Sequence, residues 1–352
     1  MNKVLICTGG GVGGAERISV LISKILIRQG FESKLFICIG ENDTPNILNF
    51  IPDTIFPSII KCKFRRLGYY LLKGIKKEKP DIIFSSMPLL ICLLVLLKPF
   101  FLFHKYKLIA RQYTMPGRMK KDLFYMTKLI LPFVDIIVAQ TNEMRDDIIR
   151  CFNTSPSKIV TIYNPIDKEL IKEKLKESFK MSPDYINFVA VGRIAVAKNY
   201  EVMLNAFKLY LDNYKKARLY IIGKISDSEY CASILKLVND LELTDFVFFE
   251  GLQYNPYKYI ASADVFLLSS KVEGLPNAMI EAMYIGIPVV STQCVPFVSQ
   301  VIEDGVNGFT VGIGDYQKMA SAMDKATKLK RPQRGNDITN GEVALANIFK
   351  TI

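Results

Sequence analysis

The chain has 352 residues and a formal net charge of +12, and half of its residues are hydrophobic. That length exceeds one ordinary core and predicts two well-filled domains of about 150 to 180 residues each. Seven scattered cysteines without a Cys-x-x-Cys spacing argue against a disulfide scaffold, and the first residues lack the apolar segment of a signal peptide. We therefore expect a reduced, cytosolic protein.

The positive charge is confined to the first half of the chain. Residues 1–180 hold 29 Lys and Arg against 16 Asp and Glu, whereas residues 181–352 hold 17 against 18. A basic face on one half fits nucleic acid, an anionic bilayer surface or a phosphorylated substrate.

A strand, a glycine loop and a helix open the chain. Residues 3–8 are apolar, five glycines follow within positions 9–14, and an amphipathic pattern continues to residue 28. Gly9, Gly11 and Gly14 fit the Gly-x-Gly-x-x-Gly pattern of dinucleotide sites, with Glu41 after the next strand as a candidate ribose ligand. A glycine run meets many patterns by accident, so close backbone approach to a ligand and a plain tight turn both stay open.

Two segments of the first half are suited to a membrane surface. Residues 61–79 interleave eight Lys and Arg with aromatic and aliphatic side chains, which is typical of an interfacial helix but also of a solvated surface helix. Residues 87–97 form an apolar run about half as long as a bilayer-spanning helix, which predicts a core helix or one that dips into a membrane.

Further strands at residues 107–111, 135–139 and 158–161, with a helix at 119–131, complete a first α/β domain. Polar residues that can line one edge of its sheet follow two of these strands: Arg111, Gln112, Tyr113, Gln140, Thr141 and Asn142. The Asn-Pro-Ile-Asp sequence at 164–167 and the charged stretch at 168–180 predict a division into domains 1–165 and 166–352. A C-terminal helix can pack back on the first domain.

A second series of alternating elements begins with a strand at residues 186–191. Further strands are predicted at 219–223, 247–251 and 265–269, and helices at 200–211, 230–241, 255–261 and from about residue 315. Two such series predict an α/β fold of two doubly wound, Rossmann-like domains that face each other across a cleft.

Residues 269–292 have the features of a ligand site at the carboxyl edge of a parallel sheet. Pro276 suits the start of a helix and Gly286 its end, while Glu273 precedes the helix and Glu281 lies in its second turn. Both carboxylates can reach the space above the helix N-terminus. The alternative is that both are solvated surface groups.

Two cations provide the other part of this predicted site. Arg193 and Lys198 follow a strand and precede a helix, where phosphate groups commonly bind. The helix start at Pro276 supplies a second anion site. Because the sequence has no Asp-x-Asp pair and no His or Cys cluster, we expect a nucleotide diphosphate held without a metal or another cofactor.

These motifs resemble the family-four retaining glycosyltransferases of the GT-B fold, of the bacterial surface-polysaccharide type. The resemblance is carried by Gly-Gly-Ala-Glu-Arg at 13–17, the junction at 164–167, Val-Gly-Arg at 191–193 with Lys198, and Glu273 with Glu281 in a Glu-x7-Glu arrangement. The Asp-Gly-Val-Asn-Gly segment at 304–308 is similar to the family's closing turn. The resemblance spans nearly the whole chain.

The resemblance implies a role for each matching residue. As catalytic residues, Arg193 and Lys198 would neutralise the donor's diphosphate and the leaving group, and Glu273 would contact the transferred sugar. The implied donor ligands are Glu281, which would hold the ribose, and Gly13, Gly14, Gly223, Gly274, Leu275, Pro276 and Asn277. The implied acceptor ligands are Arg17, Arg111 and Gln112.

Two positions depart from the family pattern. Members often carry a histidine after a middle strand of the first domain, where this chain has Ala-Arg-Gln-Tyr at 110–113, and His104 lies too early. No catalytic histidine is therefore expected. A frequent glycine pair is here Gly223 followed by Lys224, which leaves base recognition undefined.

The activity implied by the resemblance is metal-independent, retaining transfer of a hexose or N-acetylhexosamine from a UDP-sugar to a lipid-linked saccharide in O-antigen or capsule synthesis. Front-face attack is favoured over a covalent intermediate on Glu273. The basic half would hold the enzyme at the anionic inner face of the cell membrane, and nucleic acid is not expected as a partner.

Two other classes of function stay open. A dinucleotide-dependent oxidoreductase would use the first glycine loop, but it leaves the motifs of the second domain unexplained. A non-enzymatic membrane-binding or nucleic-acid-binding module would use the basic half alone.

Overall fold

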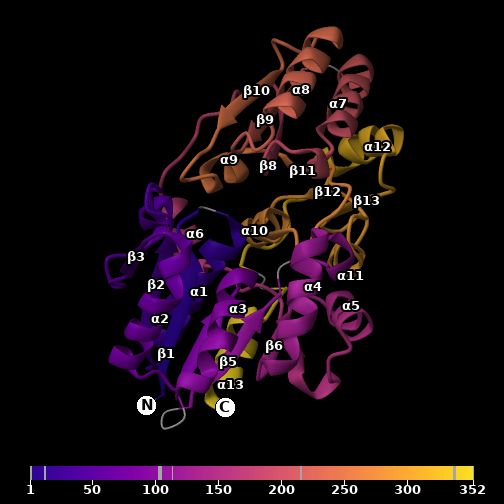
Figure 1. Cartoon of the computed structure of the whole chain (residues 1–352). Coiled ribbons are helices and arrows are strands. Elements are labelled where there is room, and N and C mark those ends of the chain that lie inside the picture. The colour runs from indigo at the N-terminus through magenta and orange to yellow at the C-terminus, as the bar shows by residue number, and fades with distance from the viewer. Residues whose placement is uncertain are drawn as a thin grey trace. The chain divides into compact units, whose positions relative to one another are not determined.

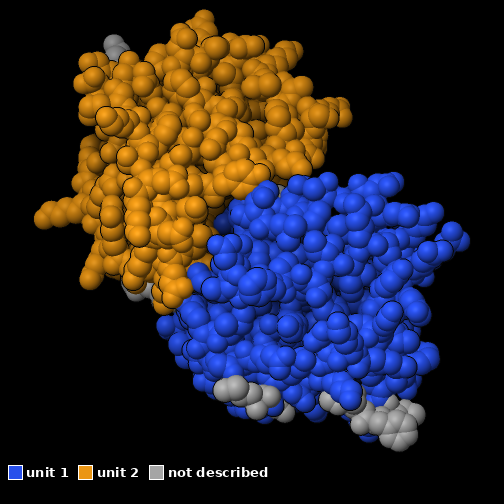
Figure 2. Space-filling model, turned by 90° about the vertical axis from the view of Figure 1, so that its left-hand side faces the viewer, with its two compact units in different colours: residues 1–165, 339–352 blue, residues 166–338 orange. Residues whose placement is uncertain are grey.

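The chain forms two compact units, Met1–Pro165 with Thr339–Ile352 and Ile166–Ile338 (Figure 2). The computed structural model describes residues 2–11, 13–101, 105–112, 114–214, 216–335 and 338–351. His104 and Tyr113 lie outside these described residues. Each unit is built on one parallel sheet with helices (Figure 1), so the predicted α/β class with two doubly wound domains is confirmed.

The first unit has a seven-stranded parallel sheet in the order β3-β2-β1-β4-β5-β6-β7. The strands are β1 (Lys3–Gly9), β2 (Glu32–Ile39), β3 (Ser58–Lys61), β4 (Ile82–Ser85), β5 (Lys107–Arg111), β6 (Ile136–Ala139) and β7 (Ile159–Thr161). The helices are α1 (Gly14–Arg28), α2 (Phe64–Glu78), α3 (Pro88–Leu97), α4 (Lys121–Ile130), α5 (Asn142–Phe152) and α13 (Gly341–Thr351), with short 3-10 helices η1 (Asn46–Phe50), η2 (Lys98–Phe101), η3 (Pro116–Arg118), η4 (Leu131–Phe133) and η5 (Pro156–Lys158).

Alternating side chains of β1 place this sheet between two apolar layers. Ile6 packs with α1 and α13, whereas the neighbouring Leu5 packs with α2, α3 and α5. Successive strand residues point to opposite faces, so a strand buried on both sides needs an unbroken apolar run, which β1 has. The helix α13 therefore belongs to the first unit, although it follows the second unit in sequence.

Three details differ from the sequence predictions, two in the first unit and one at the start of the second. The segment around Lys61 is the strand β3, and the basic helix begins only at Phe64. The helix α5 was not predicted; Thr141 caps it by accepting a hydrogen bond from the amide of Met144. The charged stretch after Asp167 begins with a helix, α6 (Lys168–Lys174), which Asp167 caps in the same way.

The second unit has a six-stranded parallel sheet in the order β10-β9-β8-β11-β12-β13. The strands are β8 (Ile186–Val191), β9 (Ala217–Ile222), β10 (Val247–Gly251), β11 (Val265–Leu268), β12 (Val289–Thr292) and β13 (Gly308–Val311). The helices are α6, α7 (Tyr200–Tyr214), α8 (Ser228–Asp240), α9 (Tyr257–Ser262), α10 (Asn277–Ile285), α11 (Pro296–Val301) and α12 (Tyr316–Thr327), with the 3-10 helix η6 (Val196–Lys198).

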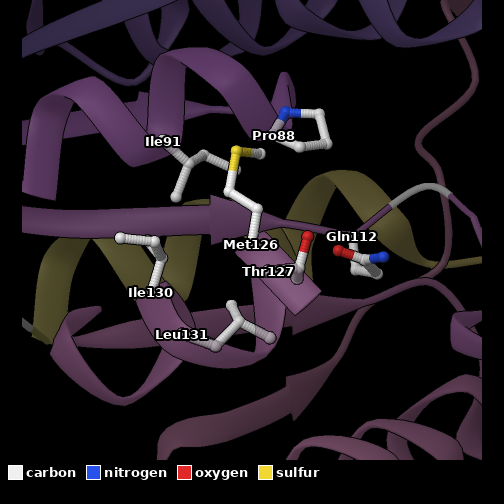
Figure 3. A pocket seen from close by; sticks show the side chains of 7 residues that line it. All are labelled: Pro88, Ile91, Gln112, Met126, Thr127, Ile130 and Leu131. Atoms are coloured by element: carbon white, nitrogen blue, oxygen red, sulfur yellow. The ribbon is translucent and has the colours of Figure 1, made fainter. Parts of the chain in front are cut away.

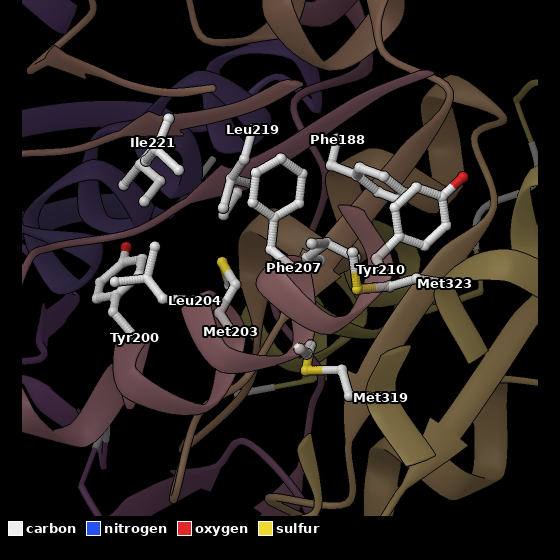
Figure 4. Packing of buried hydrophobic residues seen from close by; sticks show 14 of the residues in the cluster. Phe188, Tyr200, Met203, Leu204, Phe207, Tyr210, Leu219, Ile221, Met319 and Met323 are labelled. Carbon is white, nitrogen blue, oxygen red and sulfur yellow. The ribbon is translucent and has the colours of Figure 1, made fainter. Parts of the chain in front are cut away.

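An aromatic and methionine core holds α7 and α12 on the second sheet (Figure 4). Phe188 of β8 meets Tyr210 of α7 with ring centroids 5.0 Å apart in an edge-to-face arrangement. Met319 and Met323 of α12 are fully buried in the same cluster. This packing fixes the carboxyl end of β8 relative to the start of α7, where the predicted cations lie.

Across the described residues, none of the helices combines the length and apolar content that crossing a bilayer requires. The apolar segment 87–97 forms α3, which buries one side in the core of the first unit.

Candidate active site

The predicted site residues of the second unit gather where the strand order of its sheet reverses. The first strand, β8, lies between β9 and β11. Gly192 and Arg193 follow β8, and Ser269 and Ser270 follow β11. In open parallel sheets, ligands bind at the carboxyl ends of the strands at such a reversal.

Lys198 and Glu273 form an ion pair at this edge. The ammonium Nζ of Lys198 lies 2.6 Å from Oε1 of Glu273, and both side chains are about four-fifths shielded from solvent. The hydroxyl of Ser270 donates a second hydrogen bond to the same oxygen, at 2.7 Å. Burial, together with the charge of Glu273, raises the pKa of the nearby Tyr200 phenol. The paired arrangement excludes the solvated-carboxylate alternative for Glu273.

Side-chain to backbone hydrogen bonds hold the two segments of this ion pair together. The hydroxyl of Ser269 donates to the carbonyl of Lys198 at 2.8 Å, and Thr292 donates to the carbonyl of Ser270 at 2.7 Å. The amide of Lys271 donates to the carbonyl of Ala197 at 2.9 Å. Lys198 and Glu273 are therefore positioned by a connected network, and not by the ion pair alone.

The turn after β8 depends on a close approach between two glycines. A Cβ on Gly223 would lie 1.8 Å from the carbonyl oxygen of Gly192, so no larger residue fits there. The Gly192 amide donates to the carbonyl of Ile222, and the Tyr200 hydroxyl donates to the Gly192 carbonyl at 3.0 Å. These contacts orient the next residue, Arg193, whose side chain is exposed. Gly223 thus shapes the turn that carries Arg193.

The helix α10 follows the sequence prediction closely. It begins after Pro276 and ends at Gly286, which adopts the left-handed conformation with φ 84°. Glu281 lies in its second turn and accepts a hydrogen bond from the hydroxyl of the buried Tyr257 at 3.2 Å. The side chains of Leu275 and Pro276 are buried, whereas that of Asn277 is partly exposed. The amide of Asn277 donates to the Leu275 carbonyl.

In the first unit, the glycine loop between β1 and α1 is covered by a carboxylate. A Cβ on Gly13 would lie 2.7 Å from a carboxylate oxygen of Glu16, and one on Gly11 would lie 2.9 Å from the other. A pyrophosphate here would meet like charge, which disfavours the dinucleotide alternative. Glu41 lies on the surface, 3.7 Å from the ammonium of Lys63. Gly14 is the first residue of α1.

Two of the predicted acceptor ligands are buried. Arg111 is 3% exposed, its guanidinium donates to Oδ1 of Asn164, and burial lowers its pKa to about 10. Its Nη1 has no hydrogen-bond partner among the described residues. Gln112 is also buried and donates to the carbonyl of Thr114. The guanidinium of Arg17 stacks 5.1 Å from the ring of Phe50. These placements favour structural roles for Arg111 and Gln112 over direct acceptor contact.

Two small cavities lie beside these elements. The one between α3 and α4 has a volume of ≈ 10 Å³ and is lined by Pro88, Ile91, Gln112, Met126, Thr127, Ile130 and Leu131 (Figure 3). The other, also ≈ 10 Å³, lies beside Lys198 and Ser270. That is about the room one water needs. Neither of these two cavities is large enough to enclose a sugar.

The sequence analysis placed Ser269 and Ser270 in the predicted site segment but gave neither a role, and it missed Tyr257. The two serines follow β11 directly, which is a usable signal, but serine is common in turns for purely local reasons. Tyr257 becomes meaningful only once α9 and α10 are seen to pack together.

Comparison with known proteins agrees with this architecture. A family model described as Glycosyltransferase Family 4 matches residues 12–170, and one described as Glycosyl transferases group 1 matches residues 171–342. The chain is 30% identical over 270 residues to an uncharacterized glycosyltransferase of Methanocaldococcus jannaschii, covering 72% of this chain and 66% of that protein.

Two further proteins are similar over greater lengths. The N-acetylgalactosamine-N,N'-diacetylbacillosaminyl-diphospho-undecaprenol 4-alpha-N-acetylgalactosaminyltransferase of Campylobacter jejuni is 27% identical over 332 residues, which are 88% of this chain and 85% of that one. The chain is also similar to the crystal structure of Anabaena HepE in complex with UDP-glucose. The match covers 100% of both chains with a TM-score of 0.79 and 16% identity, which shows a likeness of fold. The chain therefore belongs to the glycosyltransferases, with a family 4 N-terminal region and a group 1 C-terminal region in the GT-B fold.

Proposed function

We propose that this enzyme is a metal-independent, retaining glycosyltransferase that moves a hexose or N-acetylhexosamine from a UDP-sugar to a lipid-linked saccharide in surface-polysaccharide synthesis. The observation that carries the proposal is the Lys198–Glu273 ion pair beside the exposed Arg193 at the strand-order reversal. Two cations at one edge can supply the charge that a diphosphate leaving group needs.

The ion pair suggests how the donor binds. Its diphosphate would take Lys198 from Glu273, because a diphosphate carries more negative charge than one carboxylate. The freed Glu273, still held by Ser270, would then accept hydrogen bonds from hydroxyls of the sugar. Binding of the diphosphate and recognition of the sugar are coupled in this arrangement. Glu281, fixed by Tyr257, fits the ribose hydroxyls as a rigid acceptor.

Transfer itself would need little covalent participation by the protein. The bond from the sugar C1 to the phosphate oxygen breaks as the acceptor oxygen bonds to C1 from the same face, and the acceptor's proton passes to the departing phosphate oxygen. Arg193 and Lys198 stabilise the charge on the released UDP. Glu273 fits a hydroxyl ligand better than a nucleophile, because Ser270 still donates a hydrogen bond to its carboxylate after the diphosphate has taken Lys198.

The similar proteins support the choice of substrates. The name of the Campylobacter relative includes a diphospho-undecaprenol carrier, and HepE was solved with UDP-glucose. We therefore include a UDP-sugar donor, a lipid-linked acceptor and a peripheral position on the inner face of the cell membrane in the proposal. We also keep Gly223 and the segment 274–277 as donor ligands. Gly13 and Gly14 stay in the proposal as a loop that approaches the donor away from its diphosphate, which the Glu16 carboxylate would repel. The side chains of Arg111 and Gln112 are not kept as acceptor ligands.

Equilibrium binding and turnover across a panel of UDP-, GDP- and ADP-sugars test this function. We expect a UDP-sugar to bind and react, with no loss of rate on addition of EDTA. Arg193→Ala and Lys198→Ala should each lower the rate by about a hundredfold or more. Lys271→Ala, which removes an exposed lysine from the same sheet edge, is the matched control. No binding or turnover of any donor would overturn the proposal.

A further inference from the structure

One surface of the first unit exposes an unusual number of large apolar side chains. It is formed by the outward sides of α2, α3 and α4 with the short helices η2 and η4, and is called the α2–α4 surface below. Its most exposed apolar residues include Tyr69, Leu96, Phe100, Leu129 and Phe133, with relative exposures from 58% to 72%. Scattered single apolar residues are ordinary on a surface, but a group over adjoining helices marks an interaction site.

The middle of this surface is a helix without any charged residue. Figure 1 shows α3 between α2 and α4, and α3 contacts both. Its inner residues, such as Leu90 and Leu94, are buried against the sheet, while Leu89 and Leu96 are exposed on its outer side. A surface helix in water normally carries polar residues on its outer side. The exposed side of α3 is therefore suited to an apolar environment.

Cations flank this apolar strip. The three helices hold seven Lys and Arg against two acids. The exposed cations are Arg65, Arg66, Lys73, Lys76 and Lys77 of α2 and Lys121 and Lys128 of α4. Of the two acids, Glu78 lies 3.1 Å from the ammonium of Lys3. The surface thus combines an apolar centre with a strongly positive border.

We propose that the α2–α4 surface binds an anionic lipid bilayer, with α3 and the ends of α2 and α4 in the headgroup region. Aromatic and aliphatic side chains would enter the boundary with the acyl chains, while Lys and Arg contact anionic headgroups. A second copy of the chain fits poorly, because two such borders would repel each other. The inference extends the proposed function and rests on it in one respect, since a lipid-linked acceptor requires work at a membrane.

Flotation with lipid vesicles tests this surface without any substrate. We expect the protein to float with phosphatidylcholine vesicles that contain phosphatidylglycerol, to bind pure phosphatidylcholine far less, and to dissociate as salt rises. Each cation near an anionic surface contributes about fivefold to binding. Replacing Lys73, Lys76 and Lys77 by Gln together should therefore lower vesicle binding by about a hundredfold.

Matched control variants show whether vesicle binding depends on the α2–α4 surface itself or only on the total charge and hydrophobicity of the protein. The control for charge replaces three exposed lysines of the second unit by Gln: Lys236, Lys325 and Lys330. It removes the same charge and should leave vesicle binding nearly unchanged. The double variant Leu96→Ser with Leu129→Ser should lose binding, whereas Leu235→Ser with Val343→Ser, at exposed positions elsewhere, should retain it. Thermal unfolding checks that all four variants are folded.

Three results would overturn the inference. The first is that the protein does not bind anionic vesicles. The second is that the control variants lose as much vesicle binding as the test variants. The third is that the protein binds no vesicles but forms a dimer in light scattering, and that Leu96→Ser with Leu129→Ser abolishes this dimer. If the protein binds vesicles but uses no nucleotide sugar, the membrane surface is supported and the proposed function is contradicted. If it transfers sugar but binds no vesicles, the proposed function is supported and the membrane surface is contradicted.

Discussion

The ammonium of Lys198 lies 2.6 Å from the carboxylate of Glu273, although 75 positions separate the two residues in sequence. A donor diphosphate has to compete with Glu273 for this lysine. The ion pair therefore links the two halves of the proposed donor site, the phosphate ligands after β8 and the sugar ligand after β11.

Glu273→Gln should have opposite effects on binding and on transfer. The neutral amide keeps the size of the side chain but releases Lys198, so we expect UDP to bind several-fold tighter. Transfer should fall by at least about tenfold, because the amide accepts sugar hydroxyls less strongly than a carboxylate does. Calorimetry with UDP and a turnover assay measure the two effects.

The control for this change is Glu201→Gln, which alters a carboxylate that accepts from Tyr230 within the same unit. It should leave UDP affinity unchanged. Weaker UDP binding by Glu273→Gln would show that the ion pair does not compete with the donor.

Ser270 is expected to act by positioning Glu273. It is fully buried and donates to the carboxylate at 2.7 Å. Ser270→Ala should lower kcat by about tenfold, the order of one lost hydrogen bond to a charged group, with little change in KM. Ser270→Cys, which retains a weak donor, should recover part of the rate. A variant Ser233→Ala tests an unrelated hydroxyl, and equal rates for Ser270→Ala and the parent protein would remove Ser270 from the mechanism.

Gly223→Ala should destabilise the protein, because the added Cβ would overlap the Gly192 carbonyl at 1.8 Å. We expect the free energy of unfolding to fall by more than about 2 kcal/mol, measured by denaturant titration. In contrast, Gly68→Ala in α2 has no atom within 4 Å of the added Cβ and should stabilise by up to about 1 kcal/mol. Similar stabilities for the two variants would contradict the close packing described here.

The stability of the second unit should fall above pH 9 in part through Cys294. Burial, with the charge of Glu273 added, raises the pKa of this thiol from 9.0 to about 12. The unfolded thiol ionises first, so its contribution is complete below pH 9 and is lost as pH rises toward 12, by about 1 kcal/mol per pH unit. The free energy of unfolding, measured by chemical denaturation, should fall less between pH 8 and pH 10 for Cys294→Ala than for the parent chain. An equal fall in both proteins would refute this role.

The fold was largely predictable because most elements have a strong local signal. The strand β10 (Val247–Gly251) and the end of α10 at Gly286 agree with the predicted positions, since apolar runs and a glycine stop are local features. The helix α5 was missed because its buried residues are few: Met144, Ile148 and Phe152 form a narrow stripe among charged residues. The packing of α13 on the first sheet depends on contacts far apart in sequence.

For the candidate site, the sequence predicted which chemical groups take part but not how they contact one another. The pattern of Arg193, Lys198, Glu273 and Glu281 indicated phosphate and sugar ligands, but no spacing in the sequence shows that Lys198 and Glu273 touch. The burial of Arg111 was missed for the same reason, because a residue at a strand end is covered only by elements that come later in the chain, such as the segment at Asn164.

The most direct test of the proposed function is mass spectrometry of the acceptor. The enzyme would be incubated with vesicles that contain a polyprenyl-diphosphate saccharide and with each UDP-sugar in turn, and the linkage of any product would be determined by NMR. We predict a product heavier by one hexose or N-acetylhexosamine, with the donor's anomeric configuration retained, and none from Lys198→Ala. Donor hydrolysis without a heavier lipid product, or a product of inverted configuration, would contradict the account.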